Sequence, residues 1–343
     1  MSEFDPNAVA SEDSGIFGLP YTEAESALVY VPVPWEVTTS YGGGTANGPS
    51  AILHASRQVD LFDLEIMRPY EAGLFMLPES AEVRAWNAEA CAKLKNNRHA
   101  EKSIQYANAM GEKLNQYVFN ETKRLLAQNK IPAIVGGDHS VPFGAFQAIA
   151  EKYPEYGVLH FDAHSDTREA FEGFTWSHAS IMYNALQHIP EIKKLVQVGI
   201  RDFCEEEYDY THQVQKDRVH VNFDLHLKHE KMHGKTWAAL TEKMISPLPK
   251  HVWISFDIDG LDPSFCPNTG TPVPGGLTFD EANYLIAALV RSGRTIIGFD
   301  LNEVSPGIDQ ASEWDANVGA RLLYKLTAWT LASQGICQQN RDG

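Results

Sequence analysis

The feature that most constrains the fold is a series of short apolar runs, rich in β-branched residues, that alternate with segments of helical period. These runs lie at residues 27–33, 73–77, 131–137, 156–162, 195–200, 218–223, 251–257 and 295–300. They stay apolar throughout, which is typical of strands that are buried on both faces of a parallel sheet and covered by helices. The sequence therefore predicts a three-layer αβα sandwich around an eight-stranded, mostly parallel sheet.

The segments between the runs show the spacing of amphipathic helices. The clearest of them are residues 103–129, 141–153, 177–189 and 278–293. No linker, internal repeat or shift in composition divides the 343 residues. We therefore expect a single catalytic domain over residues 26–335, preceded by an N-terminal extension over residues 1–25.

The charge of the chain limits its partners. The formal net charge is −17, and no run of Lys and Arg forms a basic patch, which argues against binding to nucleic acid or to an anionic membrane. The first residues lack the basic and apolar regions of a secretory signal, and no apolar stretch is long enough to span a bilayer. We expect a cytoplasmic protein that acts on a small molecule.

Four of the predicted strands run directly into polar, mostly acidic clusters. IPAIV is followed by GGDHS, GVLHF by DAHSD, WISF by DIDGLD and IIGF by DLNE. Ligands of parallel α/β sheets bind outside the carboxyl ends of the strands. The clusters are therefore predicted to meet at one edge of the sheet.

These clusters contain a repeated spacing of metal-ligating residues. Side chains at every second position of a strand point the same way, so ligands that alternate along a strand can converge on one point. A single Asp after a strand is more often a helix cap or turn residue, and we assign Asp138 and Asp300 that role. The predicted metal ligands are His139, Asp162, His164, Asp166, Asp257 and Asp259.

Four buried carboxylates require a counter-charge, which two divalent cations supply. Oxygen ligands with a minority of imidazole favour Mn²⁺ over zinc, although the ligand set does not separate manganese from nickel or cobalt. A water shared by two metals can ionise near neutral pH. The pattern therefore predicts hydrolysis by a metal-bound hydroxide.

With GGDHS, DAHSD and SFDIDGLDPSFCPNTGTPVPGGL in place, the sequence resembles the ureohydrolases, which include arginase, agmatinase, guanidinobutyrase, guanidine hydrolase and formimidoylglutamase. The resemblance extends from about Val33, through GTANGPSAI, to the segment near Leu331. It implies an arginase-like sandwich, two Mn²⁺ per subunit with Ni²⁺ or Co²⁺ as alternatives, and a homotrimer or homohexamer.

The resemblance also implies a role for each matching residue. One metal would be bound by His139, Asp162, Asp166 and Asp257, and the other by Asp162, His164, Asp257 and Asp259. Glu303 of GFDLNEVSP would face the guanidinium group of the substrate. Asp166 would handle the proton of the attacking water, and His178 of WSHAS, with a pKa normally near 6.5, would exchange protons with solvent.

Departures from the arginase pattern bear on the substrate. Arg168 stands where arginases have an Asn, and Cys204 stands where they have an Asp near the substrate amino group. Arginine is therefore a poor first choice. Agmatine or another small guanidino compound leads, with free guanidine, a guanidino acid or formiminoglutamate as alternatives.

The residues around the substrate tail leave alternatives open. Arg168 could bind a substrate carboxylate, or it could pair with Glu169 or Glu172 without touching substrate. Trp176 and Thr271 are further candidates for the pocket wall. A function of a different class, a metal-binding sensor or assembly subunit without catalysis, is disfavoured because every matched residue is present.

Overall fold

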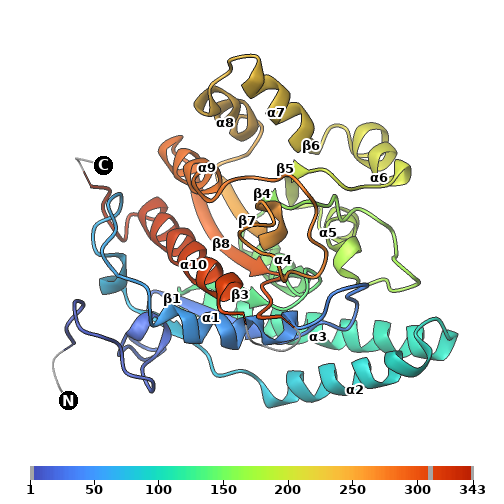
Figure 1. Ribbon diagram of the computed structural model, residues 1–343, viewed down its shortest axis with the longest axis horizontal. Helices are drawn as coiled ribbons and strands as arrows, with labels where there is room; N and C mark the ends of the chain where they lie inside the picture. The colour runs from blue at the N-terminus through green and yellow to red at the C-terminus, as the bar shows by residue number, and fades with distance from the viewer. Residues whose placement is uncertain (1–3, 308–311, 341–343) are drawn as a thin grey trace.

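The computed structural model describes residues 4–307 and 312–340. A single sheet of eight strands forms its centre, in the order β2-β1-β3-β8-β7-β4-β5-β6, and every neighbouring pair is parallel (Figure 1). The predicted eight-stranded sheet is confirmed. Its strands are β1 (Leu28–Val33), β2 (Leu74–Met76), β3 (Ile131–Gly136), β4 (Tyr156–Phe161), β5 (Ile192–Ile200), β6 (Val219–Phe223), β7 (His251–Asp257) and β8 (Thr295–Asn302).

Helices cover both faces of the sheet. They are α1 (Gly48–Ser56), α2 (Ala81–Asn97), α3 (Glu101–Ala127), α4 (Phe143–Lys152), α5 (Ile181–His188), α6 (Glu205–Asp209), α7 (Asp224–Met232), α8 (Trp237–Ile245), α9 (Phe279–Arg291) and α10 (Trp314–Ser333). Within residues 4–307 and 312–340, no helix combines the length and apolarity needed to cross a membrane.

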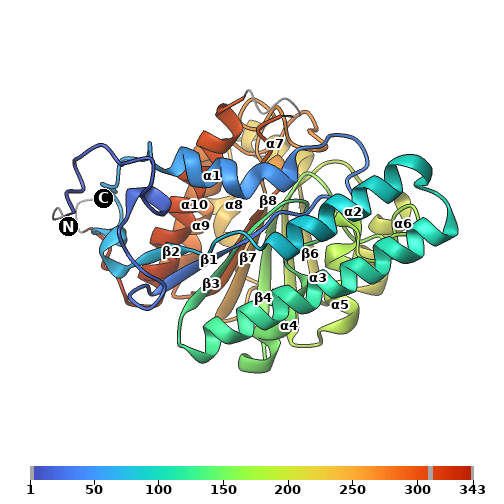
Figure 2. The same cartoon turned by 90° about the horizontal axis from the view of Figure 1, so that it is seen from below.

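The two helical layers enclose two separate cores, because side chains alternate across the strands. In β1, Tyr30 belongs to the core beneath α1, α9 and α10, whereas Val29 and Val31 belong to the core beneath α2, α3 and α4. Figure 2 shows α2, α3 and α4 on one side of the sheet and α1, α9 and α10 on the other. The N-terminal segment joins the first core, where the ring of Phe17 lies 5.0 Å from that of Tyr324.

The order of the strands decides where the polar clusters meet. The chain forms β4, β5 and β6 on one side of β3, and then returns to place β7 and β8 between β3 and β4. As a result, the four strands that end in polar clusters are adjacent, in the order β3-β8-β7-β4. Their carboxyl ends form one continuous edge at the centre of the sheet.

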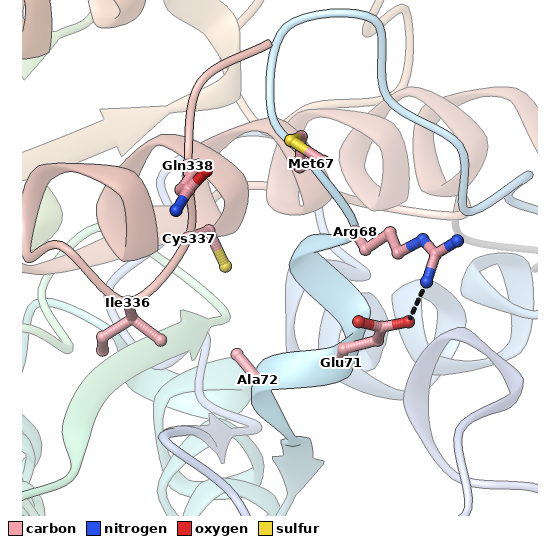
Figure 3. A pocket seen from close by; sticks show the side chains of 7 residues that line it. All are labelled: Met67, Arg68, Glu71, Ala72, Ile336, Cys337 and Gln338. Carbon is pink, nitrogen blue, oxygen red and sulfur yellow. Dashed lines mark hydrogen bonds and ion pairs between the residues drawn. The ribbon is translucent and has the colours of Figure 1, made fainter.

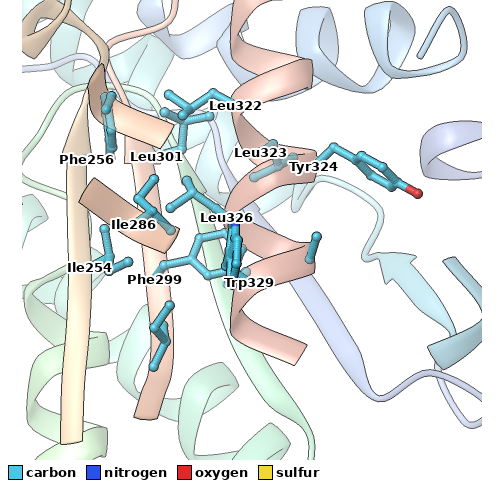
Figure 4. Close-up of a cluster of buried hydrophobic side chains, with 14 of the residues drawn as sticks. Ile254, Phe256, Ile286, Phe299, Leu301, Leu322, Leu323, Tyr324, Leu326 and Trp329 are labelled. Atoms are coloured by element: carbon cyan, nitrogen blue, oxygen red, sulfur yellow. The ribbon is translucent and has the colours of Figure 1, made fainter. Parts of the chain in front are cut away.

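The core between β8 and α10 offers a stability test with a matched control (Figure 4). Leu326 of α10 is fully buried in this cluster, whereas Leu225 of α7 is 61% exposed. Leu326→Ala should lower the free energy of unfolding by about 2–5 kcal/mol through lost burial and a residual cavity. Leu225→Ala should change it by less than about 0.5 kcal/mol. Urea-induced unfolding measures both, and equal losses would contradict the assignment of this core.

Candidate metal centre and substrate pocket

His139 lies just beyond β3 and faces three carboxylates. Its Nδ1 atom is 3.0 Å from Asp162 Oδ2, 3.3 Å from Asp257 Oδ2 and 3.4 Å from Asp166 Oδ2. All four side chains are almost completely buried. A single ring nitrogen has at most one hydrogen to share among three oxygens. One cation between these atoms would satisfy all of them, so the geometry fits a bound metal.

His164 forms the second group. Its Nδ1 atom is 3.2 Å from Asp259 Oδ2 and 3.4 Å from Asp162 Oδ1. Asp162 thus presents one oxygen to each histidine and joins the two groups. The predicted ligands from the ends of β3, β4 and β7 are brought together in this way, and two groups of His and Asp side chains that share Asp162 have the geometry to hold a metal ion.

The reason that they converge differs from the predicted one. Strand β4 ends at Phe161, so Asp162, His164 and Asp166 follow the strand instead of alternating along it. Asp166 has the left-handed φ of 55°, and its carbonyl accepts hydrogen bonds from the backbone of Met182 and Tyr183. The turn after β4, pinned to the start of α5, therefore directs the Asp166 side chain. The alternation argument was wrong for this segment.

Asp257 and Asp259 are also fixed by local backbone contacts. Asp257 is the last residue of β7, and Asp259 lies in the 3₁₀ turn Ile258–Gly260. The backbone N–H of Asp259 donates to Asp257 Oδ1 at 2.9 Å, and that of Ala163 donates to Asp259 Oδ1 at 3.0 Å. The second bond ties the turn after β7 to the turn after β4. The two acidic motifs thus hold each other in place.

The cluster is electrostatically strained without a counter-charge. Burial, followed by the charge of Asp162, raises the pKa of Asp166 to about 8. Burial and the neighbouring Asp259 and Asp162 raise the pKa of Asp257 well above its ordinary value. Burial opposes a charge on His139 too, yet its carboxylate hydrogen bonds outweigh this and raise its pKa. The site therefore attracts positive charge, as expected of a place for divalent cations.

The sequence analysis missed His160. This buried residue of β4 places Nε2 2.8 Å from Asp162 Oδ2, and its Nδ1 is 3.0 Å from Gln197 Nε2. Since the Gln197 amide can only donate, the hydrogen of a neutral His160 is on Nε2 and is donated to Asp162. His160 precedes Asp162 by two positions, but this spacing does not by itself distinguish a functional histidine from one packed inside an apolar run.

Glu303 follows β8 and lies beside His139. Its Oε1 accepts a hydrogen bond from the His139 backbone at 3.0 Å, and its own N–H donates to Gly137 at 2.8 Å. The residue adopts φ of 62°, although it is not glycine. Its Oε2 is buried and has no hydrogen-bond partner among the described residues. A buried carboxylate oxygen without a partner is costly unless a ligand satisfies it.

His178 opens the short 3₁₀ turn His178–Ser180 and is held by its backbone. Its N–H donates to Thr38 Oγ1 at 3.1 Å, and the ring meets that of Phe171 edge-on at 5.9 Å. Burial, followed by the positive charge of His164, lowers the pKa of His178 to about 3. The imidazole is therefore neutral at pH 7. The ordinary pKa near 6.5 assumed from the sequence does not describe this environment.

A pocket of about 190 Å³ leads to the cluster. Its inner wall includes His164 and Asp166, and its outer wall includes Phe171, Phe203 and Arg168. A second cleft, too tight for a water molecule, shares Ser40, His178 and Thr271 with this pocket and is also lined by Glu303. The Thr271 hydroxyl lies 3.4 Å from Asp259 Oδ2. The cluster, the pocket and the cleft at Glu303 are thus adjacent.

Arg168 has contacts that the sequence did not indicate. Arg168 Nε lies 3.4 Å from Glu207, and its guanidinium carbon lies 5.1 Å from the centre of the Phe171 ring. The expected pairing with Glu169 or Glu172 was wrong, because the carboxylate found beside Arg168 is that of Glu207, and Glu172 pairs with Arg98.

Trp176 packs against Phe143, with ring centres 4.8 Å apart. It is not among the residues that line the 190 Å³ pocket or the cleft at Glu303. Trp176 also packs against Gly111 of α3, and Phe143 is the first residue of α4. Unlike Arg168 and Thr271, Trp176 therefore packs between helices and does not line the 190 Å³ pocket.

A different pocket, of about 380 Å³, lies between the segment 67–72 and the C-terminal residues Ile336, Cys337 and Gln338 (Figure 3). Its charged side chains, Arg68 and Glu71, pair with each other at 3.1 Å. Burial raises the pKa of the Cys337 thiol to about 11, so the thiol is not ionised at neutral pH. This pocket therefore offers no catalytic group.

Known proteins resemble the chain over most of its length. It matches the model of the Arginase family over residues 26–328. It is 33% identical over 306 residues to N(1)-aminopropylagmatine ureohydrolase of Thermus thermophilus, which covers 89% of this chain and 90% of the relative. It is 28% identical to agmatinase of Bacillus cereus, over 89% of this chain and 92% of that one. The crystal structure of agmatine ureohydrolase of Thermoplasma volcanium superimposes with a TM-score of 0.69 at 23% identity, covering 91% of this chain and 92% of the other. The chain therefore belongs to the arginase family and is a ureohydrolase of that family.

Proposed function

We propose that this protein uses two metal ions to hydrolyse a guanidino C–N bond and to release urea and an amine. The observation that carries the proposal is the pair of His/Asp groups joined by Asp162 and placed beside the unpartnered oxygen of Glu303. Agmatine or another small guanidino compound is the proposed substrate. Relatives named for agmatine and aminopropylagmatine support this choice.

Mn²⁺ is the proposed metal, with Ni²⁺ and Co²⁺ as alternatives, because the donor set is rich in carboxylate oxygen and contains two imidazoles. The proposed ligands are His139, Asp162, Asp166 and Asp257 for one ion and Asp162, His164, Asp257 and Asp259 for the other. When bound, the two ions would offset the buried negative charge and make a water molecule acidic enough to attack at neutral pH.

The other residues bind the substrate and move protons. Glu303 Oε2 would accept hydrogen bonds from the guanidinium group, fixing the planar cation beside the cluster. Asp166 lies at the inner end of the pocket and would take the proton of the attacking water. His178, which lines both the pocket and the cleft, would exchange protons with the departing amine and with solvent. Thr271 and Arg168 also line the pocket.

The remaining expectations accompany this proposal. We propose one catalytic domain over residues 26–335 with an extension at 1–25, a cytoplasmic location, and a homotrimer or homohexamer. The net charge of −17 supports a small guanidino compound as partner in preference to nucleic acid or a membrane surface.

A substrate panel tests the proposal. Protein loaded with Mn²⁺, Ni²⁺ or Co²⁺ should release urea from at least one of agmatine, guanidine, guanidinobutyrate, guanidinopropionate and arginine. Formiminoglutamate tests the formimidoylglutamase alternative, and its cleavage is followed by release of formamide. If the loaded protein hydrolyses none of these compounds, the hydrolase proposal fails and the metal-binding sensor or assembly subunit takes its place.

Two neighbouring glycines provide a prediction about the cleft at Glu303. Gly42 donates its N–H to Gly270 at 3.1 Å, and a Cβ at Gly42 would lie only 2.8 Å from that carbonyl oxygen. Among residues 4–307 and 312–340, a Cβ at Gly43 would meet nothing within 4 Å. Gly42→Ala should therefore push the segment that carries Gly42 away from the segment that carries Gly270, and it should lower kcat/KM for urea release about tenfold. Gly43→Ala should remain close to the unsubstituted protein, and equal losses in both variants would contradict the role of this contact.

A further inference from the structure

Asp300 has contacts that a helix cap or turn residue would not make. It lies inside β8, not after it, and is fully buried, so the cap or turn role predicted from the sequence was wrong. Its Oδ1 accepts a hydrogen bond from Ser255 Oγ at 2.8 Å, and its Oδ2 accepts one from Trp253 Nε1. Both of these donors belong to the neighbouring strand β7, and the amide of Asn302, in β8 itself, also donates to Oδ1. The carboxylate therefore connects two strands beneath the metal cluster.

The same serine contacts His139. His139 Nε2 lies 2.9 Å from Ser255 Oγ. A serine hydroxyl has a single hydrogen, and the carboxylate of Asp300 can only accept one. The Ser255 hydrogen is therefore directed to Asp300, and Ser255 must accept the hydrogen of His139 Nε2. The direction of each hydrogen bond in the series from His139 through Ser255 to Asp300 is thus fixed.

This direction determines which nitrogen of His139 can bind a metal. In the neutral imidazole that a metal requires, a hydrogen on Nε2 leaves the Nδ1 lone pair free for an ion that would lie among the oxygens of Asp162, Asp166 and Asp257. We propose that Asp300 and Ser255 are positioning residues that keep His139 in this tautomer and so prepare the metal site that His139 shares. The inference rests on the proposed two-metal function.

The second metal site provides an internal comparison. His164 also directs Nδ1 at the cluster, but its side chain is 24% exposed, and in residues 4–307 and 312–340 no hydrogen bond to its Nε2 is found. The hydrogen bonds from His139 through Ser255 to Asp300 therefore support only the proposed site that includes His139. Disrupting these hydrogen bonds should weaken metal binding at that site and leave the site of His164 able to bind its metal.

Asp300→Asn should reverse the direction of the series. If the amide oxygen accepts from Trp253, the amide NH₂ faces both Ser255 and the Asn302 amide, and Ser255 must turn its own hydrogen towards His139 Nε2. The imidazole hydrogen then moves to Nδ1, where the metal would bind. If the amide takes the opposite orientation, its NH₂ faces the Trp253 N–H as a buried pair of donors. We expect the Mn²⁺ affinity of one site to fall about 10–100-fold, so that bound metal falls from two ions per chain to one.

Three further variants separate orientation from packing. Ser255→Ala removes the connection without placing a hydrogen on Nδ1, so it should weaken the same site less, by about tenfold. Ser255→Thr keeps the hydroxyl and should restore binding. Trp253→Phe removes only the donor to the other oxygen of Asp300, so it should lower the free energy of unfolding while leaving the metal count unchanged.

Titration of the metal-free full-length variants with Mn²⁺, with metal counted by atomic emission and folding followed by circular dichroism, tests this inference without an activity assay. If Asp300→Asn does not fold, the comparison of Ser255→Ala with Ser255→Thr decides. Two ions bound with unchanged affinity in Asp300→Asn or Ser255→Ala would overturn the inference alone, as would a loss in Trp253→Phe equal to that in Asp300→Asn. If the unsubstituted protein binds no divalent metal, the inference and the proposed function fail together.

Discussion

Replacing Asp162 with Asn should empty both metal sites and abolish urea release. Asp162 presents Oδ2 to His139 and Oδ1 to His164, so it is the carboxylate that the two His/Asp groups share. Asn preserves the shape of the side chain but removes its charge and turns one acceptor into a donor. Bound metal ions stabilise the transition state of such a hydrolysis by several kcal/mol. Because this stabilisation would be lost, we expect kcat/KM to fall by roughly a thousandfold or more.

Metal content and urea release, measured on the same preparation, check this prediction. Asp280→Asn is the control, because Asp280 is an exposed carboxylate in the first turn of α9. It should keep both activity and metal. An Asp162→Asn variant that retains two bound ions would contradict the shared role of Asp162.

Glu303→Gln should reduce kcat/KM by about a hundredfold and leave the metal content unchanged. The Glu303 side chain is held on one side by the His139 N–H, and its second oxygen is buried and has no hydrogen-bond partner in the part of the chain that the structure describes. A carboxylate gives the guanidinium a charge-assisted hydrogen bond, whereas Gln gives a neutral oxygen at best and a repelling NH₂ at worst. The loss should therefore concern substrate binding and positioning.

Metal content distinguishes the prediction for Glu303 from the prediction for Asp162. Atomic emission should find the same amount of metal in Glu303→Gln as in the unsubstituted protein, while urea release falls. Glu112→Gln, an exposed change on α3, serves as the matched control and should have full activity. If Glu303→Gln is as active as Glu112→Gln, Glu303 does not contact the substrate.

Much of the site was predictable because the sequence shows where each buried strand ends and which polar residues follow it. Apolar runs such as WISF end abruptly at acidic residues, and this break marks the carboxyl end of a buried strand. The residues that follow, including Asp257 and Asp259, have the donor atoms of a metal site whatever the details of the turn. His160 was missed because a lone histidine inside an apolar run looks like a packed residue, and only its contact with Asp162 identifies it.

The contacts of Arg168 show where prediction from spacing fails. The candidates considered for its partner were close in sequence, Glu169 and Glu172, but the contact found is with Glu207 of α6. The carboxylate of Glu207 also accepts hydrogen bonds from the backbone of Thr167 and Cys204, so it connects two turns that follow different strands. A contact of this kind depends on the packing of separate elements, which local sequence does not encode.

By itself, the sequence determined the alternation of strands and helices, the parallel sheet and the chemical nature of the ligands, because these follow from hydrophobic pattern and residue type. Only the tertiary structure decided that β7 and β8 lie between β3 and β4, and thus that the four polar clusters share one edge. It also decided the left-handed backbone at Asp166 and Glu303 and the contact of Asp300 with Ser255. The physical reason is that strand order, turn conformation and buried hydrogen bonds are selected by contacts between segments far apart in the chain, and these contacts form only when the whole sheet is assembled.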